Sequence, residues 1–215
     1  MKMKVAPSIL SADFGKMAEA VENVKAWNAD WVHCDVMDGV YVPNITFGMP
    51  MIKALRKYSD MVLDVHLMIT KPEKYVGQFC DAGADVVTFH PEASDDVQGA
   101  LDTIKSKGKK CGLVINADQP FDIVEKYLDQ IDLLLIMTVQ AGFGGQSFKP
   151  ECVDKARLGA ELRAKYGYKY DIEIDGGVSP KNVELLKDAG ANVAVAGNAV
   201  FKSEDPALTI KQMQI

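Results

Sequence analysis

Short runs of apolar and β-branched residues recur along the chain, and each is followed by a segment whose apolar positions repeat at helical spacing. Eight such runs occur. Their mean spacing of roughly 27 residues is typical of strand–helix units. We therefore predict eight strands, each followed by a helix, over Val5–Leu10, Trp31–Val36, Met61–Met68, Asp85–His90, Cys111–Ile115, Leu133–Val139, Asp171–Ile174 and Asn192–Ala196.

Two of these units resemble each other in sequence. The segment Asp81–His90 is echoed by Asp188–Gly197, which begins 107 residues further on, half the chain away. Such an echo among evenly sized units favours a closed ring, with these two segments in its fourth and eighth units. An open doubly wound sheet is the alternative. We expect residues 1–215 to form one domain, an α/β fold of the (β/α)8 TIM barrel type.

Turn residues predict where some of the helices begin and end. Ser179 followed by Pro180 indicates an N-cap and a first-turn proline, and Gly190 stands where a left-handed residue ends a helix. Pro72 and Gly83 repeat this pattern in the first half of the chain.

Composition narrows the classes of partner and the compartment. The chain of 215 residues has a formal charge of −6 and no basic run, which argues against nucleic acid and anionic membranes as partners. No stretch has the apolar length of a membrane span, and the first residues do not resemble a secretory signal. We expect a cytoplasmic protein whose four separated cysteines are reduced and mostly buried.

Histidines and carboxylates occupy alternating positions on two predicted neighbouring strands. His33, Asp35 and Met37 alternate on the second strand, and residues two apart on a strand point to the same face. Asp64, His66 and Met68 alternate on the third strand, and Asp175 ends the seventh. Two imidazoles and two carboxylates suit a divalent transition metal. The predicted ligands are His33, Asp35, His66 and Asp175.

Four other polar residues near these strand ends receive supporting roles. Asp64 and Glu173 lie deeper on their strands and are expected to orient ligands. His90 has no carboxylate in register, so we assign it a structural or supporting role. Asp38 points away from the ligands and is expected to shape a loop.

Glycine clusters follow three consecutive predicted strands, the sixth to the eighth. Exposed backbone amides can close on an anion there, and barrels commonly hold phosphate in the loops of their last strands. Ser8, at the end of the first strand, could add a hydroxyl. Methionines near the mouth would exclude water. The predicted substrate-binding residues are Ser8, Met37, His66, Met68, Met137, Gly142, Phe143, Gly144, Gly145, Gly176, Gly177, Gly197 and Asn198.

Linked motifs along nearly the whole chain give it a close resemblance to the ribulose-phosphate 3-epimerase family. They are Ala6–Leu10 (APSIL), His33–Gly39 (HCDVMDG), Val42–Gly48 (VPNITFG), Asp64–Met68 (DVHLM), Gly142–Gln146 (GFGGQ) and Asp175–Gly177 (DGG). The resemblance implies a ribulose-phosphate binding barrel that interconverts D-ribulose 5-phosphate and D-xylulose 5-phosphate in the pentose phosphate pathway.

The resemblance also implies roles for the individual residues. Asp35 and Asp175 would be the acid/base pair as well as metal ligands, with proton transfer at the third carbon through an enediolate. One divalent metal ion per subunit is expected, with zinc or ferrous iron favoured over manganese or cobalt, and no organic cofactor. The expected partner is a small sugar phosphate, and the expected assembly is a homo-oligomer.

Two departures and three rival functions accompany this interpretation. Gln140-Ala141 stands where the family usually has Asn-Pro, and Asn198 stands where it usually has Ser. The nearest rival is D-allulose-6-phosphate 3-epimerase, which shares the catalytic residues. A Schiff-base aldolase would need a lysine at a strand end, and none of the eight ends has one. A non-catalytic phosphosugar-binding protein would not need paired carboxylates.

Overall fold

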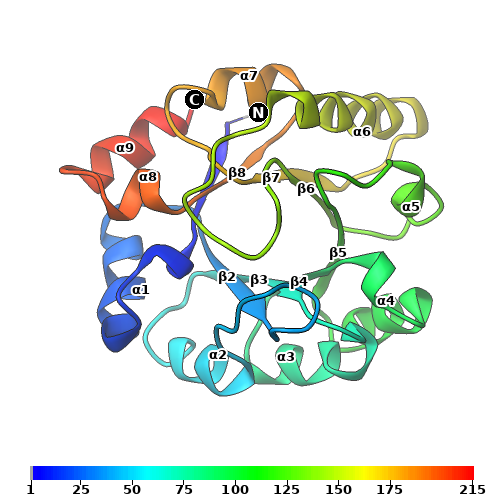
Figure 1. The fold of residues 1–215 in the computed structure, drawn as a ribbon, viewed down its shortest axis with the longest axis horizontal. Helices are drawn as coiled ribbons and strands as arrows, with labels where there is room; N and C mark the ends of the chain where they lie inside the picture. The colour runs from blue at the N-terminus through cyan, green and yellow to red at the C-terminus, as the bar shows by residue number, and fades with distance from the viewer. Residues whose placement is uncertain (1) are drawn as a thin grey trace.

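Eight parallel strands form the centre of the computed structural model, which describes residues 2–215 (Figure 1). The strands are β1 (Lys4–Pro7), β2 (Trp31–Met37), β3 (Val62–Met68), β4 (Val86–Phe89), β5 (Lys110–Ile115), β6 (Leu133–Met137), β7 (Asp171–Asp175) and β8 (Val193–Ala196). Each overlaps one predicted strand, so the strand–helix interpretation is confirmed.

The strands close into a barrel. Neighbours follow the order β1-β8-β7-β6-β5-β4-β3-β2, and a parallel bridge between Ser8 and His33 joins the two ends of this order. In an open doubly wound sheet, β1 would instead lie in the interior of the sheet. The prediction of a closed barrel is confirmed, with the two similar segments in units four and eight.

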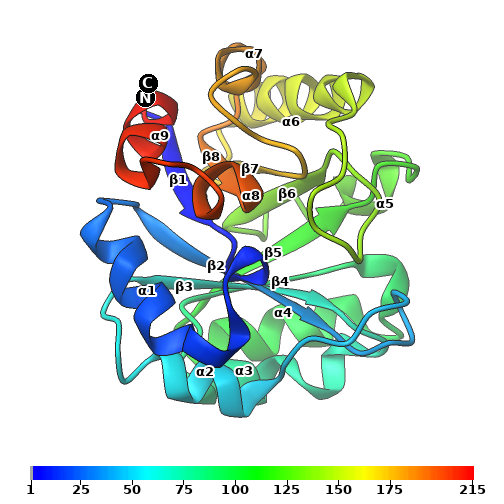
Figure 2. The same cartoon turned by 60° about the vertical axis from the view of Figure 1, so that its left-hand side comes forward.

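Helices surround the barrel, most of them between consecutive strands (Figures 1 and 2). The α-helices are α1 (Met17–Ala26), α2 (Met49–Leu55), α3 (Val76–Ala82), α4 (Val97–Ser106), α5 (Asp122–Glu125), α6 (Val153–Tyr166), α7 (Val183–Asp188), α8 (Asn198–Phe201) and α9 (Pro206–Met213). The short 3-10 helices are η1 (Ile9–Ser11), η2 (Phe14–Lys16), η3 (Pro72–Lys74), η4 (Pro91–Ala93) and η5 (Pro150–Cys152).

The turn residues give a mixed result. Gly83, directly after α3, and Gly190, two residues after the last residue of α7, adopt positive φ angles of 118° and 89°, as predicted. The predicted start of α7 is wrong, because the helix begins at Val183 after Asn182. The Ser179 amide donates to Asn182 Oδ1 at 2.9 Å, so Ser179 and Pro180 belong to a turn that precedes the helix.

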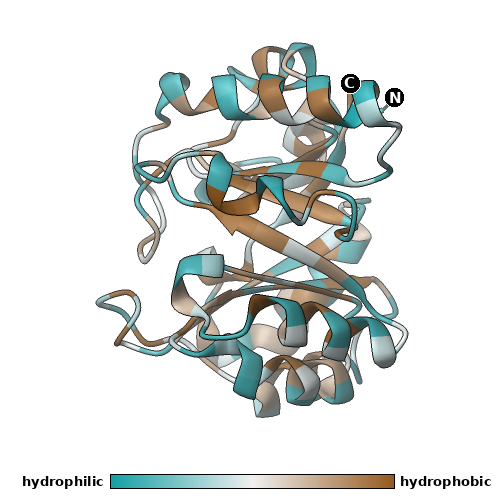
Figure 3. Cartoon of the chain, turned by 90° about the vertical axis from the view of Figure 1, so that its right-hand side faces the viewer, coloured by the Kyte–Doolittle hydropathy of each residue, from teal (hydrophilic) through white to brown (hydrophobic). Residues whose placement is uncertain are grey.

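The hydrophobic core lies between the strands and the helices. Strand β6 is apolar and buried along its whole length, because a parallel strand inside a barrel is covered on both faces. Figure 3 shows the strands in brown at the centre and the helices striped in brown and teal. All four cysteines are free and buried, as expected. Within residues 2–215, every helix is too short or too polar to pass through a bilayer.

Gly112 on β5 provides a test of barrel packing. A Cβ atom at this position would lie 2.5 Å from the Leu133 carbonyl oxygen and 2.8 Å from Thr88 Cγ2. Because the oxygen belongs to the backbone of β6, it cannot move aside cheaply. We expect Gly112→Ala to lower the free energy of unfolding by about 1–3 kcal/mol, measured by urea denaturation.

Gly48→Ala is the matched control, because its Cβ would have only Pro50 Cδ nearby, at 3.9 Å. We expect Gly48→Ala to lower the free energy of unfolding by less than about 1 kcal/mol. Equal losses in the two variants would contradict the packing explanation.

Candidate active site and metal centre

The register of β2 against β3 stacks the polar side chains in layers. His33 pairs with Asp64, Asp35 with His66, and Met37 with Met68. These positions alternate along the strands and therefore face the barrel interior together. From the bottom of the site to the mouth, the two strands contribute an imidazole with a carboxylate, a carboxylate with an imidazole, and a methionine pair.

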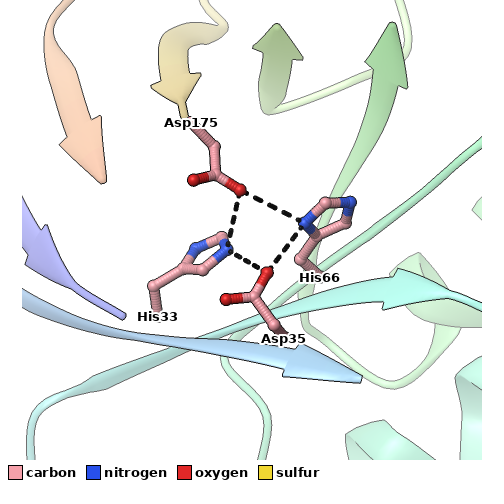
Figure 4. A group of neighbouring side chains, drawn as sticks. All are labelled: His33, Asp35, His66 and Asp175. Atoms are coloured by element: carbon pink, nitrogen blue, oxygen red, sulfur yellow. Dashed lines mark ion pairs between the residues drawn. The ribbon is translucent and has the colours of Figure 1, made fainter. Parts of the chain in front are cut away.

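The four predicted ligands converge at one point (Figure 4). Their ligand atoms all lie within 4.8 Å of one another. Asp35 Oδ1 is 3.3 Å from both His33 Nε2 and His66 Nδ1, and Asp175 Oδ2 is 3.8 Å from both. These two nitrogens and two oxygens come from three strands, and they form the mixed donor set that a divalent transition metal accepts.

The state of the two ligand nitrogens fits a metal ion. His33 Nε2 and His66 Nδ1 are fully buried and have no hydrogen-bond partner within the described part of the chain. Buried nitrogens are normally hydrogen-bonded, so two of them aimed at the same pair of carboxylates indicate a missing cation. The residues present are therefore suited to hold a divalent ion.

Asp64 and Glu173 lie below the ligands. Asp64 Oδ2 is 2.5 Å from His33 Nδ1, and a proton on Nδ1 leaves Nε2 free as a ligand. This contact agrees with the orienting role expected for Asp64. Glu173 lies 3.8 Å from the same nitrogen. Burial, together with the Asp64 charge, raises the pKa of Glu173 well above its ordinary value.

Asp35 and Asp175 differ in their affinity for a proton. Burial alone would raise the pKa of Asp35, but the His33 charge and the neighbouring His66 ring hold it well below its usual range. Burial and the neighbouring Asp35 charge raise the pKa of Asp175 to about 7. Ser8 Oγ also donates to Asp35 Oδ2 at 2.5 Å, so the Ser8 hydroxyl supports this carboxylate.

His90 has no carboxylate in register on the strands, but it has a carboxylate partner that the strand pattern did not predict. His90 Nδ1 faces Glu92 Oε1 at 3.6 Å, and His90 Nε2 lies 2.9 Å from His66 Nε2. Glu92 follows the strand in the 3-10 helix η4, which turns its side chain back over the strand end. Strand alternation could not reveal this contact, because Glu92 lies outside the strand.

A cavity of about 220 Å³ opens above Asp35 and Asp175. Every predicted substrate-binding residue except His66 lines it, and His66 lies fully buried in the ligand cluster beneath. Met37, Met68 and Met137 belong to one apolar cluster at the mouth. The other predicted lining residues are Ser8, Gly142, Phe143, Gly144, Gly145, Gly176, Gly177, Gly197 and Asn198.

The glycines on the opposite wall allow several segments to approach one another closely. A Cβ on Gly197 would lie 2.4 Å from Ser11 Oγ, and a Cβ on Gly145 would lie 2.6 Å from Asn198 Nδ2. Gly177 has a φ of 67°, and its Cβ would lie 2.7 Å from the Phe148 amide nitrogen. Gly145 and Gly177 have positive φ angles that favour glycine, and the obstacle at Gly177 is backbone, whereas the nearest atom at Gly197 is the end of a serine side chain.

Several lining residues were not predicted. They include the polar residues Ser11, Gln140, Gln146 and Ser179. Ser11 ends η1, one turn after Ser8, and this turn places both serines on the cavity. Gln146 Nε2 donates to the Gln140 and Phe143 carbonyls at 2.6 and 2.7 Å, so it stabilises the loop after β6. In Figure 1 this yellow-green loop crosses in front of the strand ends.

Comparison with known proteins finds a family model and relatives that carry the same family name. A model of the ribulose-phosphate 3 epimerase family matches residues 4–201. The ribulose-phosphate 3-epimerase of Synechocystis sp. is 48% identical over 208 residues, covering 96% of this chain and 90% of that protein. The corresponding protein of Escherichia coli is 43% identical, covering 98% of this chain and 94% of its own length. The chloroplastic enzyme of Arabidopsis thaliana is 47% identical, with coverages of 96% and 74%.

Solved structures share the fold at lower identity. The 3-keto-L-gulonate-6-phosphate decarboxylase of Vibrio cholerae superposes with a TM-score of 0.73 at 18% identity, covering 99% of this chain and 96% of that one. The 3-hexulose-6-phosphate synthase of Salmonella typhimurium gives 0.68 at 21% identity, with coverages of 99% and 97%. These similarities support the barrel assignment alone.

From the convergence of the four predicted ligands we expect a divalent metal ion to stabilise the folded protein. An ion that binds only the folded state at a hundred times its Kd adds about 2.7 kcal/mol to the free energy of unfolding. We expect Co²⁺ to raise the Tm of chelator-stripped protein and to leave the Tm of stripped His33→Ala unchanged. Asp60→Asn, a change in an exposed carboxylate paired with Lys25, should respond like the wild type. An equal rise in His33→Ala would contradict the site.

Proposed function

The chain belongs to the ribulose-phosphate 3-epimerase family, and from this membership we propose that it interconverts D-ribulose 5-phosphate and D-xylulose 5-phosphate, a step of the pentose phosphate pathway. One observation carries the proposal for this chain. Asp35 on β2 and Asp175 on β7 direct carboxylate oxygens to one point beneath the cavity.

Inverting a carbon next to a carbonyl group requires two proton transfers on opposite faces of a flat enediolate. Asp35 and Asp175 are placed to make them, because β1 and β8 lie between their strands and the two carboxylates approach the site from different sides (Figure 4). In one direction one carboxylate removes the proton and the other carboxyl group returns one. In the reverse direction the roles exchange. No organic cofactor is required for these steps.

We assign His33, Asp35, His66 and Asp175 as the ligands of one divalent ion per subunit. A bound ion would supply Lewis acidity where negative charge develops on the substrate's oxygens. Zinc and ferrous iron are the favoured metals, with manganese and cobalt as alternatives, since two imidazoles and two carboxylates suit all four. Asp64 keeps the His33 ring in the required orientation through its 2.5 Å contact with Nδ1.

We place the substrate phosphate at the glycine-rich wall formed by Gly142–Gly145, Gly176–Gly177 and Gly197–Asn198. Among the described residues that line the cavity, no lysine or arginine occurs, so backbone amides and hydroxyl groups would bind the anion. Fixing the phosphate there would hold the third carbon between Asp35 and Asp175.

The methionines and the loop after β6 would exclude water from the reacting carbon. Met37, Met68 and Met137 offer an apolar, polarizable surface that does not compete for the proton. Phe143, at the tip of the loop, is 53% exposed and is positioned to cover a bound sugar. We propose that residues 142–145 act as a lid.

The remaining properties are proposed on more general grounds. We treat residues 1–215 as one catalytic domain, since the strands of a single ring carry all four proposed ligands. Four free, buried cysteines support a reducing compartment such as the cytoplasm, although one relative is named as chloroplastic. The strongly exposed side chains of Val40 and Ile45 support a homo-oligomer.

Asp175→Asn tests the acid/base assignment. The reaction is run in heavy water and measured by proton NMR. The wild type with metal restored should form xylulose 5-phosphate that carries deuterium at the third carbon. The variant should lose at least about a hundredfold in rate, since it cannot transfer a proton. Calorimetry should show that ribulose 5-phosphate still binds.

The exposed Glu184→Gln, on the helix after β7, should retain full activity. A variant at Asp175 with more than a tenth of the wild-type rate would overturn the assignment. Metal-loaded wild type without any exchange would support the non-catalytic alternative.

Substrate length distinguishes the pentulose from the hexulose proposal. In allulose 6-phosphate, one more carbon separates the reacting centre from the phosphate, whereas the distance between the carboxylates and the glycine wall is set by the barrel. We expect kcat/KM for ribulose 5-phosphate to exceed that for allulose 6-phosphate at least tenfold in the same coupled or NMR assay. The opposite preference would identify the chain as a hexulose-phosphate 3-epimerase.

A further inference from the structure

We propose that Glu92, acting through His90, holds His66 in the tautomer and orientation that metal binding requires, which makes Glu92 and His90 positioning residues of the site. The proposal rests on the metal site described above. The alternation of residues along the strands did not connect Glu92 with that site. The proposal also explains why the buried rings of His66 and His90 are in contact.

The first step concerns the proton on His66. Its Nδ1 faces Asp35 Oδ1 at 3.3 Å and Asp175 Oδ2 at 3.8 Å, so the lone pair of Nδ1 is the one available to an ion. A neutral imidazole whose Nδ1 is a ligand carries its proton on Nε2. That proton points at His90 Nε2, 2.9 Å away, because the two Nε2 atoms face each other.

The second step concerns the proton on His90. Only one of two facing Nε2 atoms can donate, so a His66 donor requires His90 Nε2 to be an acceptor. The proton of His90 must then lie on Nδ1. This nitrogen is fully buried, and Glu92 Oε1 faces it at 3.6 Å as its ion-pair partner. A negative charge at this position favours the Nδ1–H form, so it also favours the tautomer of His66 that can bind metal.

Glu92 is itself held in place by two other loops. Its Oε1 accepts from the Tyr41 hydroxyl at 2.8 Å and from Asn116 Nδ2 at 2.9 Å. Burial would raise the pKa of Glu92, but the contacts with His90 and Tyr41 lower it to about 2, which keeps the carboxylate charged. The Tyr41 ring also packs on the His90 ring, with centroids 4.8 Å apart.

The arrangement is therefore a directional chain from a charged group at the mouth to the ligand atom. Each ring nitrogen in it has one role: His90 Nδ1 carries the proton that faces Glu92 at 3.6 Å, His90 Nε2 accepts from His66 Nε2, and His66 Nδ1 remains free for the ion. Reversal of the His90 tautomer would set two N–H groups against each other at 2.9 Å and would turn the His66 ring away.

Metal affinity separates this proposal from a purely structural role. Chelator-stripped variants are titrated with Co²⁺, and both the Kd and the visible absorption of the bound ion are recorded, with folding verified by circular dichroism. We expect Glu92→Gln and His90→Phe to weaken Co²⁺ binding about 10- to 100-fold and to alter its absorption bands. His90→Gln should recover much of the affinity, because its amide oxygen can accept the His66 proton.

Glu73→Gln is the matched control, since Glu73 is a half-buried carboxylate in the neighbouring loop that accepts from Ser94 Oγ. It should bind Co²⁺ like the wild type. Unchanged Kd and spectrum in both Glu92→Gln and His90→Phe, with tight wild-type binding, would overturn the proposal and leave the metal site intact. Failure of the wild type to bind Co²⁺ would instead overturn the metal site itself.

Discussion

The parallel register between β2 and β3 is the constraint on which the site depends. It sets His33 beside Asp64 and Asp35 beside His66, so each imidazole has a carboxylate as its lateral neighbour. Side chains alternate across a strand. A shift of one residue in the pairing of β2 with β3 would therefore turn the polar side chains of one strand into the apolar layer beneath the helices. That layer is filled by residues such as Val65, which could not be exchanged for charged groups. The core therefore enforces the geometry of the ligands.

The cost of this geometry is a concentration of buried ionisable groups. Asp35, Asp64 and Glu173 lie almost or fully buried with two imidazoles, and several of their polar atoms have no hydrogen-bond partner among residues 2–215. Burying unpaired ionised groups is strongly unfavourable unless a counter-charge is present. The opposing shifts in the pKa of Asp35 and Asp175 reflect the same crowding. A divalent ion would relieve this repulsion, and the carboxylates would in turn bind the ion.

Loops from separate βα units complete the site above this charged layer. Asn44, in the loop after β2, donates through Nδ2 to the Gly142 carbonyl at 2.9 Å and so links that loop to the segment after β6. Tyr41, in the same loop, reaches Glu92 after β4 and Asn116 at the end of β5. The mouth is thus cross-linked by polar contacts between units that are distant in sequence. Loops that are cross-linked on a closed ring can position catalytic groups without strain in the strands.

The amino-acid sequence by itself predicted the eight strands and, from the echo between units four and eight, their closure. It also predicted that His33, Asp35, His66 and Asp175 converge, because a period of two places alternate residues of a strand on one face. The tertiary structure decided what local patterns do not encode. The hydroxyl of Ser8 supports Asp35 because η1 turns back there, although the glycine-rich wall was its expected neighbour. The start of α7 moved to Val183 because the Asn182 side chain closes the preceding turn. The contact of Glu92 with His90 likewise depends on a short helix whose direction the strand pattern cannot specify.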